Sequence, residues 1–228
     1  MLYQKIRIFL CLLLVADVMQ AAAQPSSNYP SAPIRVACVG NSITEGYGLG
    51  DSTYPAQLQR ILGPAYEVRN YGLGGRTLLK NGDRPYWKET AFQQVQQWHP
   101  QIVIIELGTN DSKPWNWKDS LNFIPNYLEF VEVFKRLPSH PEIYLCLPPP
   151  SFSDKFGIRN AVIKKQEIPM IKQVAKTEHV RIINLYKGMR HEAAHFYDGI
   201  HPDKIGAVHM AAYIARQLKL PPHHKIAQ

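Results

Sequence analysis

Short apolar segments alternate with longer helical patterns along this chain, and the alternation limits the fold more than any other feature. Residues 101–107 (QIVIIEL) are almost continuously apolar, which is typical of a parallel strand covered on both faces. We expect strands at residues 34–39, 66–71, 101–107, 142–147 and 180–185, and helices near 54–62, 86–98, 122–137, 160–177 and 203–218. We expect Pro169 to break the fourth helix into two pieces. This order predicts an α/β fold, a three-layer α/β/α sandwich around a five-stranded parallel sheet.

The beginning of the chain has the layout of a secretory signal peptide. Lys5 and Arg7 precede an apolar run, and three consecutive alanines at 21–23 offer a cleavage site. The run is interrupted at Asp17, well short of the ~20 residues needed to span a bilayer. We therefore expect a signal peptide at 1–23, a linker at 24–33, one domain at 34–220 and a tail at 221–228. The mature protein is expected to be secreted or periplasmic, without a membrane anchor.

The formal charge of the whole chain is +8, and loss of Lys5, Arg7 and Asp17 with the signal peptide leaves +7. A basic protein of this kind favours acidic glycans or anionic surfaces. No run or stripe of lysine and arginine is present, which argues against a nucleic-acid partner. The remaining cysteines, Cys38 and Cys146, lie in apolar strand-like runs and are expected to be buried thiols rather than a disulfide framework.

Polar and glycine-rich motifs follow four of the predicted strands. They are Gly40-Asn41-Ser42, residues 70–77 (NYGLGGRT), residues 108–111 (GTND) and Asp198-x-x-His201. Each motif alone also fits a structural role, such as a helix cap or a tight turn. Ligands of parallel sheets collect outside the carboxyl ends of the strands. The four motifs together therefore predict one site at that edge of the sheet.

These motifs resemble those of the SGNH hydrolases, also called the GDSL esterase/lipase family, over residues 36 to about 218. The resemblance implies a flavodoxin-like fold with Ser42 as the nucleophile and Asp198 with His201 as the acid–base pair. It also implies an oxyanion hole made by Ser42, Gly75 and Asn110. The aspartate that usually precedes the serine in this family is Asn41 here, which can still accept a hydrogen bond that fixes the turn. Asn41 also joins the candidate substrate-binding residues.

The residue types suit acyl transfer. A serine hydroxyl is a poor nucleophile until a neighbouring imidazole takes its proton, a role that falls to His201. Asp198 can hold the second ring nitrogen and stabilise the imidazolium. Backbone N–H groups and the Asn110 amide can stabilise the tetrahedral oxyanion. This chemistry requires no cofactor and no metal ion.

A competing interpretation uses the same C-terminal segment. Residues 191–195 (HEAAH) have the H-E-x-x-H spacing of a zinc protease, with His191 and His195 as ligands and His201 in the place of a third. Asp198 stands where such proteases have a glycine, and this hypothesis leaves the other strand ends unused. We therefore expect no metal site, with His191 and His195 on a surface loop or short helix.

Two tryptophans follow the third motif and bear on the substrate. Trp115 and Trp117 either stack on sugar rings or anchor their loop, and the sequence leaves both open; Tyr86 and Trp87 are weaker candidates. The segments 108–114 and 144–148 resemble the bacterial carbohydrate (sialate-type) O-acetylesterase branch, which implies removal of acetyl groups from a small-molecule or glycan ester. The alternatives are a lysophospholipase, a general short-chain esterase or thioesterase, and a glycan-binding module without catalysis. The sequence makes no prediction about the oligomeric state.

Overall fold

The computed structural model describes residues 32–219 of the chain. The predicted signal peptide (1–23), nearly all of the linker (24–33) and the tail (221–228) lie outside the described residues. No helix between residues 32 and 219 is long and apolar enough to cross a bilayer.

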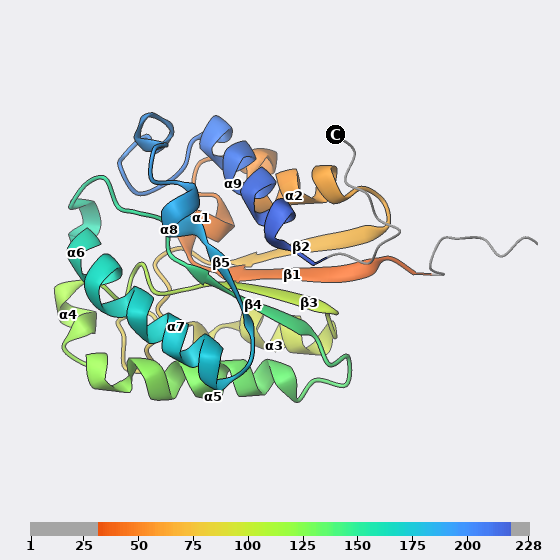
Figure 1. Cartoon of the computed structure of the whole chain (residues 1–228), viewed down its shortest axis with the longest axis horizontal. Helices are drawn as coiled ribbons and strands as arrows, with labels where there is room; N and C mark the ends of the chain where they lie inside the picture. The colour runs from red at the N-terminus through yellow and green to blue at the C-terminus, as the bar shows by residue number, and fades with distance from the viewer. Residues whose placement is uncertain (1–31, 220–228) are drawn as a thin grey trace, which may run out of the picture. The chain divides into compact units, whose positions relative to one another are not determined.

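Five parallel strands form one sheet, as the sequence predicts (Figure 1). They are β1 (Ile34–Gly40), β2 (Tyr66–Gly72), β3 (Ile102–Glu106), β4 (Glu142–Leu147) and β5 (Arg181–Asn184). Every residue of β3 is buried, because helices cover both faces of the sheet at this central strand. The α/β class with a five-stranded parallel sheet is thereby confirmed.

Nine α-helical segments surround the sheet in the described part of the chain. They are α1 (Ser42–Glu45), α2 (Tyr54–Leu62), α3 (Thr90–Gln97), α4 (Pro114–Trp117), α5 (Phe123–Lys135), α6 (Asn160–Val162), α7 (Ile168–Thr177), α8 (Leu185–Gly188) and α9 (Lys204–Gln217). Figure 1 shows α1, α2, α8 and α9 on one face and α3, α5 and α7 on the other. Each face has its own hydrophobic core, and the one beneath α3 and α5 is rich in aromatic rings, with Phe92 and Phe130 stacked at 5.0 Å.

Pro169 does not break its helix, and this expectation is corrected. A π-helical segment, Ile163–Glu167, runs directly from α6 into α7, and Ile163 and Ile168 keep right-handed helical backbone angles. Pro169, which has no N–H to donate, follows this π-helical segment as the second residue of α7, and the Ile168 N–H just before it bonds to the Ile163 carbonyl, five residues back. A local change of helical hydrogen bonding thus replaces the expected gap.

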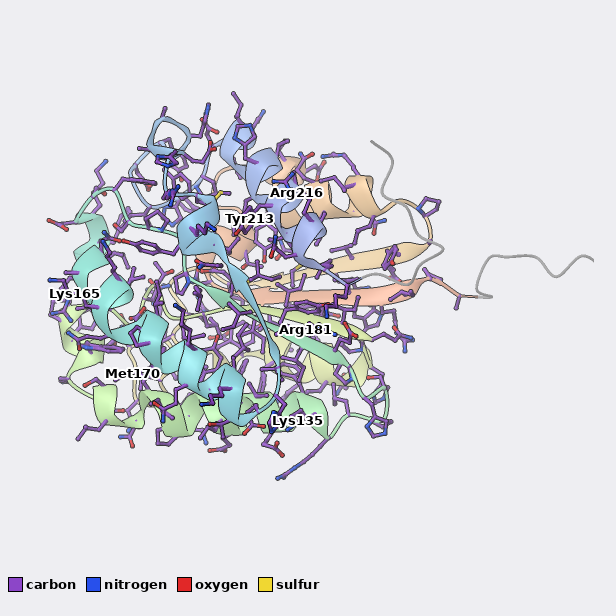
Figure 2. The ribbon with its side chains drawn as sticks, viewed as in Figure 1. Lys135, Lys165, Met170, Arg181, Tyr213 and Arg216 are labelled. Atoms are coloured by element: carbon purple, nitrogen blue, oxygen red, sulfur yellow. The ribbon has the colours of Figure 1, made fainter. Side chains whose placement is uncertain are left out.

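Ion pairs join the outer helices at the surface. Lys135, labelled at the end of α5 in Figure 2, lies 3.0 Å from the Glu132 carboxylate on its own helix and 2.8 Å from the Glu178 carboxylate just after α7. These exposed pairs contribute little to stability.

The strand order β2-β1-β3-β4-β5 determines where a ligand can bind. The chain moves outward from β1 to β2, then crosses back to β3 on the other side of β1, so β1 and β3 flank a topological switch point. The register places Gly40 of β1 opposite both Gly72 of β2 and Glu106 of β3. The loops that carry the first three polar motifs therefore leave the sheet side by side.

Candidate active site

Ser42 is the first residue of α1, directly after β1, and Asn41 caps this short helix. The Asn41 side chain accepts a hydrogen bond from the Ile43 N–H (2.9 Å) and donates one to the Glu106 carbonyl (3.3 Å). Asn41 is completely buried, so its expected place among the substrate-contacting residues is corrected. Both ends of its amide are used to fix the turn that presents Ser42.

A continuous hydrogen-bonded chain connects Ser42, His201 and Asp198. The Nε2 of His201 lies 2.8 Å from the Ser42 Oγ, and its Nδ1 lies 2.7 Å from the Asp198 Oδ2. The Asp198 Oδ1 accepts hydrogen bonds from the backbone N–H groups of Ile200 (2.8 Å) and His201 (2.7 Å). The structure thus brings together the three residues that the sequence predicts as the acid–base pair and its nucleophile.

The carboxyl group of Asp198 is held in its charged form. Partial burial raises its pKa, but the His201 side chain and the backbone N–H groups of His201 and Ile200 outweigh burial, so that the pKa stands below the usual 3.8. An ionised carboxylate at neutral pH can orient the imidazole and stabilise it when it takes up a proton.

Gly75 and Asn110 line the same cavity as Ser42 and His201. Gly75 has a left-handed backbone (φ +79°), and a Cβ built on its neighbour Gly74 would lie 2.8 Å from the Glu45 carboxylate and 3.8 Å from the Ser42 Cβ. The glycines thus allow the loop after β2 to pass close to Ser42. The Asn110 side-chain amide donates to the Arg76 carbonyl (3.1 Å), which ties this loop to the one after β3.

Two buried carboxyl groups lie beneath the loops and were not anticipated from the sequence. Asp111 accepts hydrogen bonds from the N–H groups of Leu78 (3.0 Å) and Leu79 (2.7 Å), while burial raises its pKa to about 7. Burial raises the pKa of Glu106 to about 8, although the hydroxyls of Thr109 and Thr44 donate to it at 3.4 and 3.5 Å. Both groups hold loops in place below the cavity.

The cavity above these residues has a volume of about 470 Å³. Its lining includes the apolar residues Ile158 and Ile200, the basic residues Arg76, Arg84 and Lys113, and the acidic residue Glu45. Burial lowers the pKa of Lys113 from its usual value, although the nearby Asp83 carboxylate partly offsets this effect.

Three exposed aromatic side chains surround His201, and we call Tyr47, Phe156 and Tyr197 the aromatic rim. Their ring centroids lie 5.4, 5.8 and 6.1 Å from that of the His201 imidazole. Each rim residue is more than half exposed, and Phe156 has a positive φ of 57°, unusual for a residue with a bulky side chain. The sequence gives no signal for these residues, because they lie on loops whose direction only the tertiary structure determines.

The two predicted tryptophans have different surroundings. Trp117 is buried against Phe123, and its indole N–H donates to the Gln166 side chain at 2.7 Å. Of the two roles that the sequence leaves open, the structure therefore favours a loop anchor over substrate binding. Trp115 is about half exposed and donates to the Asp83 carboxylate at 2.9 Å. It does not line the cavity around Ser42, although its ring lies against Gly157, next to the rim.

The weaker aromatic candidates belong to the interior. Tyr86 is fully buried, and its hydroxyl donates a hydrogen bond to the Tyr71 carbonyl. Trp87 is partly buried and donates to the Leu78 carbonyl at 2.7 Å. Both pack in the aromatic core and neither lines the cavity.

The three histidines of the zinc-protease hypothesis do not converge. His191 accepts a hydrogen bond from the neighbouring Arg190 side chain (2.8 Å), and His195 ends a single 3-10 turn, Ala193–His195, rather than lying on an α-helix. His201 is engaged with Ser42 and Asp198. Glu192 and His195 instead meet His209 of α9.

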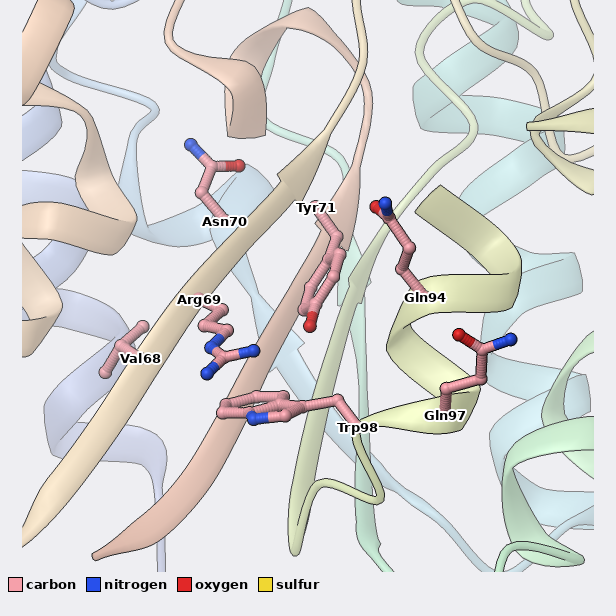
Figure 3. A pocket seen from close by; sticks show the side chains of 7 residues that line it. All are labelled: Val68, Arg69, Asn70, Tyr71, Gln94, Gln97 and Trp98. Carbon is pink, nitrogen blue, oxygen red and sulfur yellow. The ribbon is translucent and has the colours of Figure 1, made fainter. Parts of the chain in front are cut away.

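A second hollow, of about 700 Å³, lies between β2 and α3 and contains none of the predicted site residues (Figure 3). The Arg69 guanidinium lies 4.3 Å from the centre of the Trp98 ring, and Figure 3 shows the two side chains next to each other. This cation–π contact occupies one face of the Trp98 ring.

A parallel sheet with a topological switch point, and a serine, histidine and aspartate joined by hydrogen bonds beside it, is the arrangement of a serine hydrolase of the α/β/α type. Residues 38–211 match the model of the GDSL-like lipase/acylhydrolase family. The chain belongs to this family. The resemblance to the SGNH hydrolases, which the sequence motifs indicate, is thereby confirmed. Membership in this family supports the assignment of the protein to the carboxylic ester hydrolases.

Individual relatives agree with this assignment. An acetylxylan esterase of Xylanibacter ruminicola is 39% identical over 207 residues, which cover 82% of this chain but 43% of that protein, so the chain spans less than half of the relative's length. A solved carbohydrate acetylesterase from Sinorhizobium meliloti superposes with a TM-score of 0.64 at 19% identity, over 80% of this chain and 96% of that one. The aryl esterase of M. smegmatis gives 0.64 at 19% identity, over 80% and 97%. At such identities the two structures show a shared fold.

Proposed function

We propose that this protein is a serine esterase that removes acetyl or other short acyl groups from carbohydrate hydroxyls. One observation carries the proposal: the His201 Nε2 lies 2.8 Å from the Ser42 Oγ, with Asp198 on the opposite ring nitrogen at 2.7 Å. This geometry suits proton transfer from the hydroxyl during nucleophilic attack.

In the first half of the proposed reaction, the Ser42 Oγ attacks the acyl carbon while His201 takes the hydroxyl proton. The oxyanion receives hydrogen bonds from the N–H groups of Ser42 and Gly75 and from the Asn110 amide. When this intermediate collapses, the bond to the sugar oxygen breaks, and that oxygen leaves with the proton from His201. The acyl group remains on Ser42. In the second half, water repeats the attack with His201 again as the base and releases the free acid.

The carbohydrate substrate class rests on three observations. The 39% identical relative is an acetylxylan esterase. The cavity of about 470 Å³ has room for a small acyl group and an adjoining sugar. The aromatic rim offers ring faces on which the apolar C–H surface of a sugar can pack.

The other candidate functions differ in what they require of the site. A lysophospholipase or a general short-chain esterase or thioesterase would use the same Ser42, so the acyl chain and the leaving group distinguish these activities. A binding module without catalysis would lack the nucleophile or the base, and both are in place here. A zinc protease would require His191, His195 and His201 around one ion, and they do not meet.

Export forms part of the proposal and rests on the signal-peptide pattern of residues 1–23. An acetylated polysaccharide outside the cell is a suitable substrate for an exported enzyme. N-terminal sequencing of the protein from its native host should find a mature start near Gln24. A mature protein that still begins at Met1 would contradict export by this route.

The activity is tested with a chromogenic acetate ester. We expect Ser42→Ala to lower kcat by about 10⁶-fold, the scale of loss when the serine of such a triad is removed. A strong chelator should leave the turnover of the wild type unchanged at room temperature. Chelator-sensitive activity that survives in Ser42→Ala would contradict the serine mechanism.

Substrate comparisons then refine the assignment. Turnover should fall as the acyl chain grows from acetyl to octanoyl, and acetylated xylo-oligosaccharides should be better substrates than lysophospholipids. A preference for long acyl chains would favour the lysophospholipase alternative.

A further inference from the structure

The segment 191–195 contributes two side chains to a cluster outside the candidate active site. Glu192 and His195 lie together with His209 of α9, and one possible ligand atom from each lies within 4.8 Å of the other two. We propose that these three residues bind one divalent transition-metal ion of the zinc class, which holds the 3-10 turn at 193–195 against α9. This site is separate from the proposed esterase activity.

The geometry requires only small side-chain movements. The Glu192 Oε2 already lies 2.8 Å from the His209 Nδ1, and the imidazole rings of His195 and His209 lie 5.5 Å apart at 85°. Two ligand atoms of a tetrahedral zinc ion, each at about 2.0–2.1 Å from the metal, are about 3.4 Å apart. The cluster therefore reaches metal-binding dimensions by side-chain movements on the order of 1 Å.

The ligand chemistry selects the class of ion. Two imidazoles and one carboxylate form a nitrogen- and oxygen-donor set that suits zinc and neighbouring transition metals, whereas calcium and magnesium prefer oxygen ligands alone. The three side chains are partly exposed, so an ion can enter from solvent and keep a water molecule as its fourth ligand.

A neighbouring carboxylate can orient the His195 ring, as carboxylates commonly do for the histidines that bind metal ions in proteins. The Asp203 Oδ2 lies 3.3 Å from the His195 Nδ1, so Asp203 can hold one ring nitrogen while the other binds the ion. The Asp203 Oδ1 in turn accepts from the Gly206 N–H (2.8 Å) as the N-cap of α9, and the Asp203 N–H donates to the His195 carbonyl (2.8 Å). The backbone that carries the ligands is thus fixed before any ion arrives.

The position of the cluster predicts what the ion does. Its ligands lie on both sides of the segment 196–203 along the chain, and this segment carries Asp198 and His201. A bound ion therefore cross-links the two ends of the loop that carries the acid–base pair. We expect it to stabilise the fold and to take no part in the chemical step.

The test uses the full chain, stripped of metal with a chelator and then titrated with Zn²⁺ by isothermal titration calorimetry and thermal unfolding. The wild type should bind one equivalent and unfold at a higher temperature with Zn²⁺ than without. His209→Ala and His195→Ala should weaken this binding by more than about 100-fold and lose the thermal shift. Asp203→Asn keeps a residue that caps helices well and should weaken binding by about 10- to 100-fold.

His191→Ala is the matched control, because His191 belongs to the same H-E-x-x-H pattern but lies outside the cluster. It should bind Zn²⁺ as the wild type does. The proposal is overturned if the wild type shows no saturable binding, if His209→Ala binds equally well, or if binding requires His191. Calorimetry measures Zn²⁺ binding without any ester substrate, so the outcome is independent of the esterase proposal.

Discussion

The floor and the rim of the candidate active site are built in opposite ways. The floor consists of buried polar groups, among them Asn41, Glu106 and Asp111, whose hydrogen bonds are made within the protein. The rim residues Tyr47 and Phe156 are more than half exposed. A change in the floor leaves buried polar groups without partners, which is costly, whereas a change in the rim removes only surface contacts. We infer that the floor determines the chemistry and that the rim determines which ester is used.

Within this comparison, the largest loss of kcat is expected from a change at Asp198, which contacts the His201 imidazole. Asp198→Asn removes the charge that stabilises the His201 imidazolium, and kcat on a chromogenic acetate should fall by about 10⁴-fold. Asp203→Asn serves as a control at a nearby aspartate whose carboxylate bonds His195 and the Gly206 N–H, and it should keep wild-type turnover in metal-free buffer. A loss of less than tenfold in Asp198→Asn would contradict the proposed role of Asp198.

A smaller loss is expected from the oxyanion donors. Asn110→Ala removes one donor and should lower kcat by about 10²–10³-fold with little change in KM, because the interaction forms in the transition state. The Asn110 amide also bonds the Arg76 carbonyl, so a thermal melt of the variant must accompany the kinetics. A rise in KM with kcat unchanged would assign Asn110 to substrate binding instead.

The two tryptophans extend the comparison from activity to stability. Trp117→Ala should lower the free energy of unfolding by about 3–5 kcal/mol, because it empties a buried site. Trp115→Ala removes a half-exposed ring and one hydrogen bond to Asp83, and should cost about 1 kcal/mol. Urea denaturation measures both, and equal losses would show that Trp115 anchors the loop as firmly as Trp117.

The smallest effects are expected at the rim, and they should depend on the substrate. Tyr47→Ala and Phe156→Ala should leave kcat/KM for a small chromogenic acetate within about threefold of the wild type. For acetylated xylo-oligosaccharides the loss should approach tenfold, since a ring contact worth about 1.4 kcal/mol corresponds to that factor. Equal losses on both substrates would remove the distinction between floor and rim.

The positions of Ser42, Asp198 and His201 are predictable from the sequence because their signals are local. Each strand is a short apolar run, and the register of a parallel sheet brings the polar residues that follow Gly40 and Glu106 together. Asp198 and His201 are three residues apart, so the spacing itself suggests their pairing.

The remaining features depend on tertiary packing, which no local pattern encodes. Phe156 lies on a loop whose direction follows from the fold, and Trp117 is buried only because Phe123 and Gln166 lie beside it. The H-E-x-x-H pattern pointed to His191 and His201 as ligand partners of His195, whereas α9 places His209 there. Asn41 carries a polar amide of the kind that can bind a substrate, but both ends of this amide make hydrogen bonds inside the fold.

The most direct test of the account is covalent capture of the nucleophile. The full chain is treated with a fluorophosphonate probe, and the modified residue is located by peptide mass spectrometry. The account predicts one adduct, on Ser42, that forms together with loss of esterase activity and is absent from Ser42→Ala. Modification of a different residue, or unchanged activity with Ser42 fully modified, would contradict it.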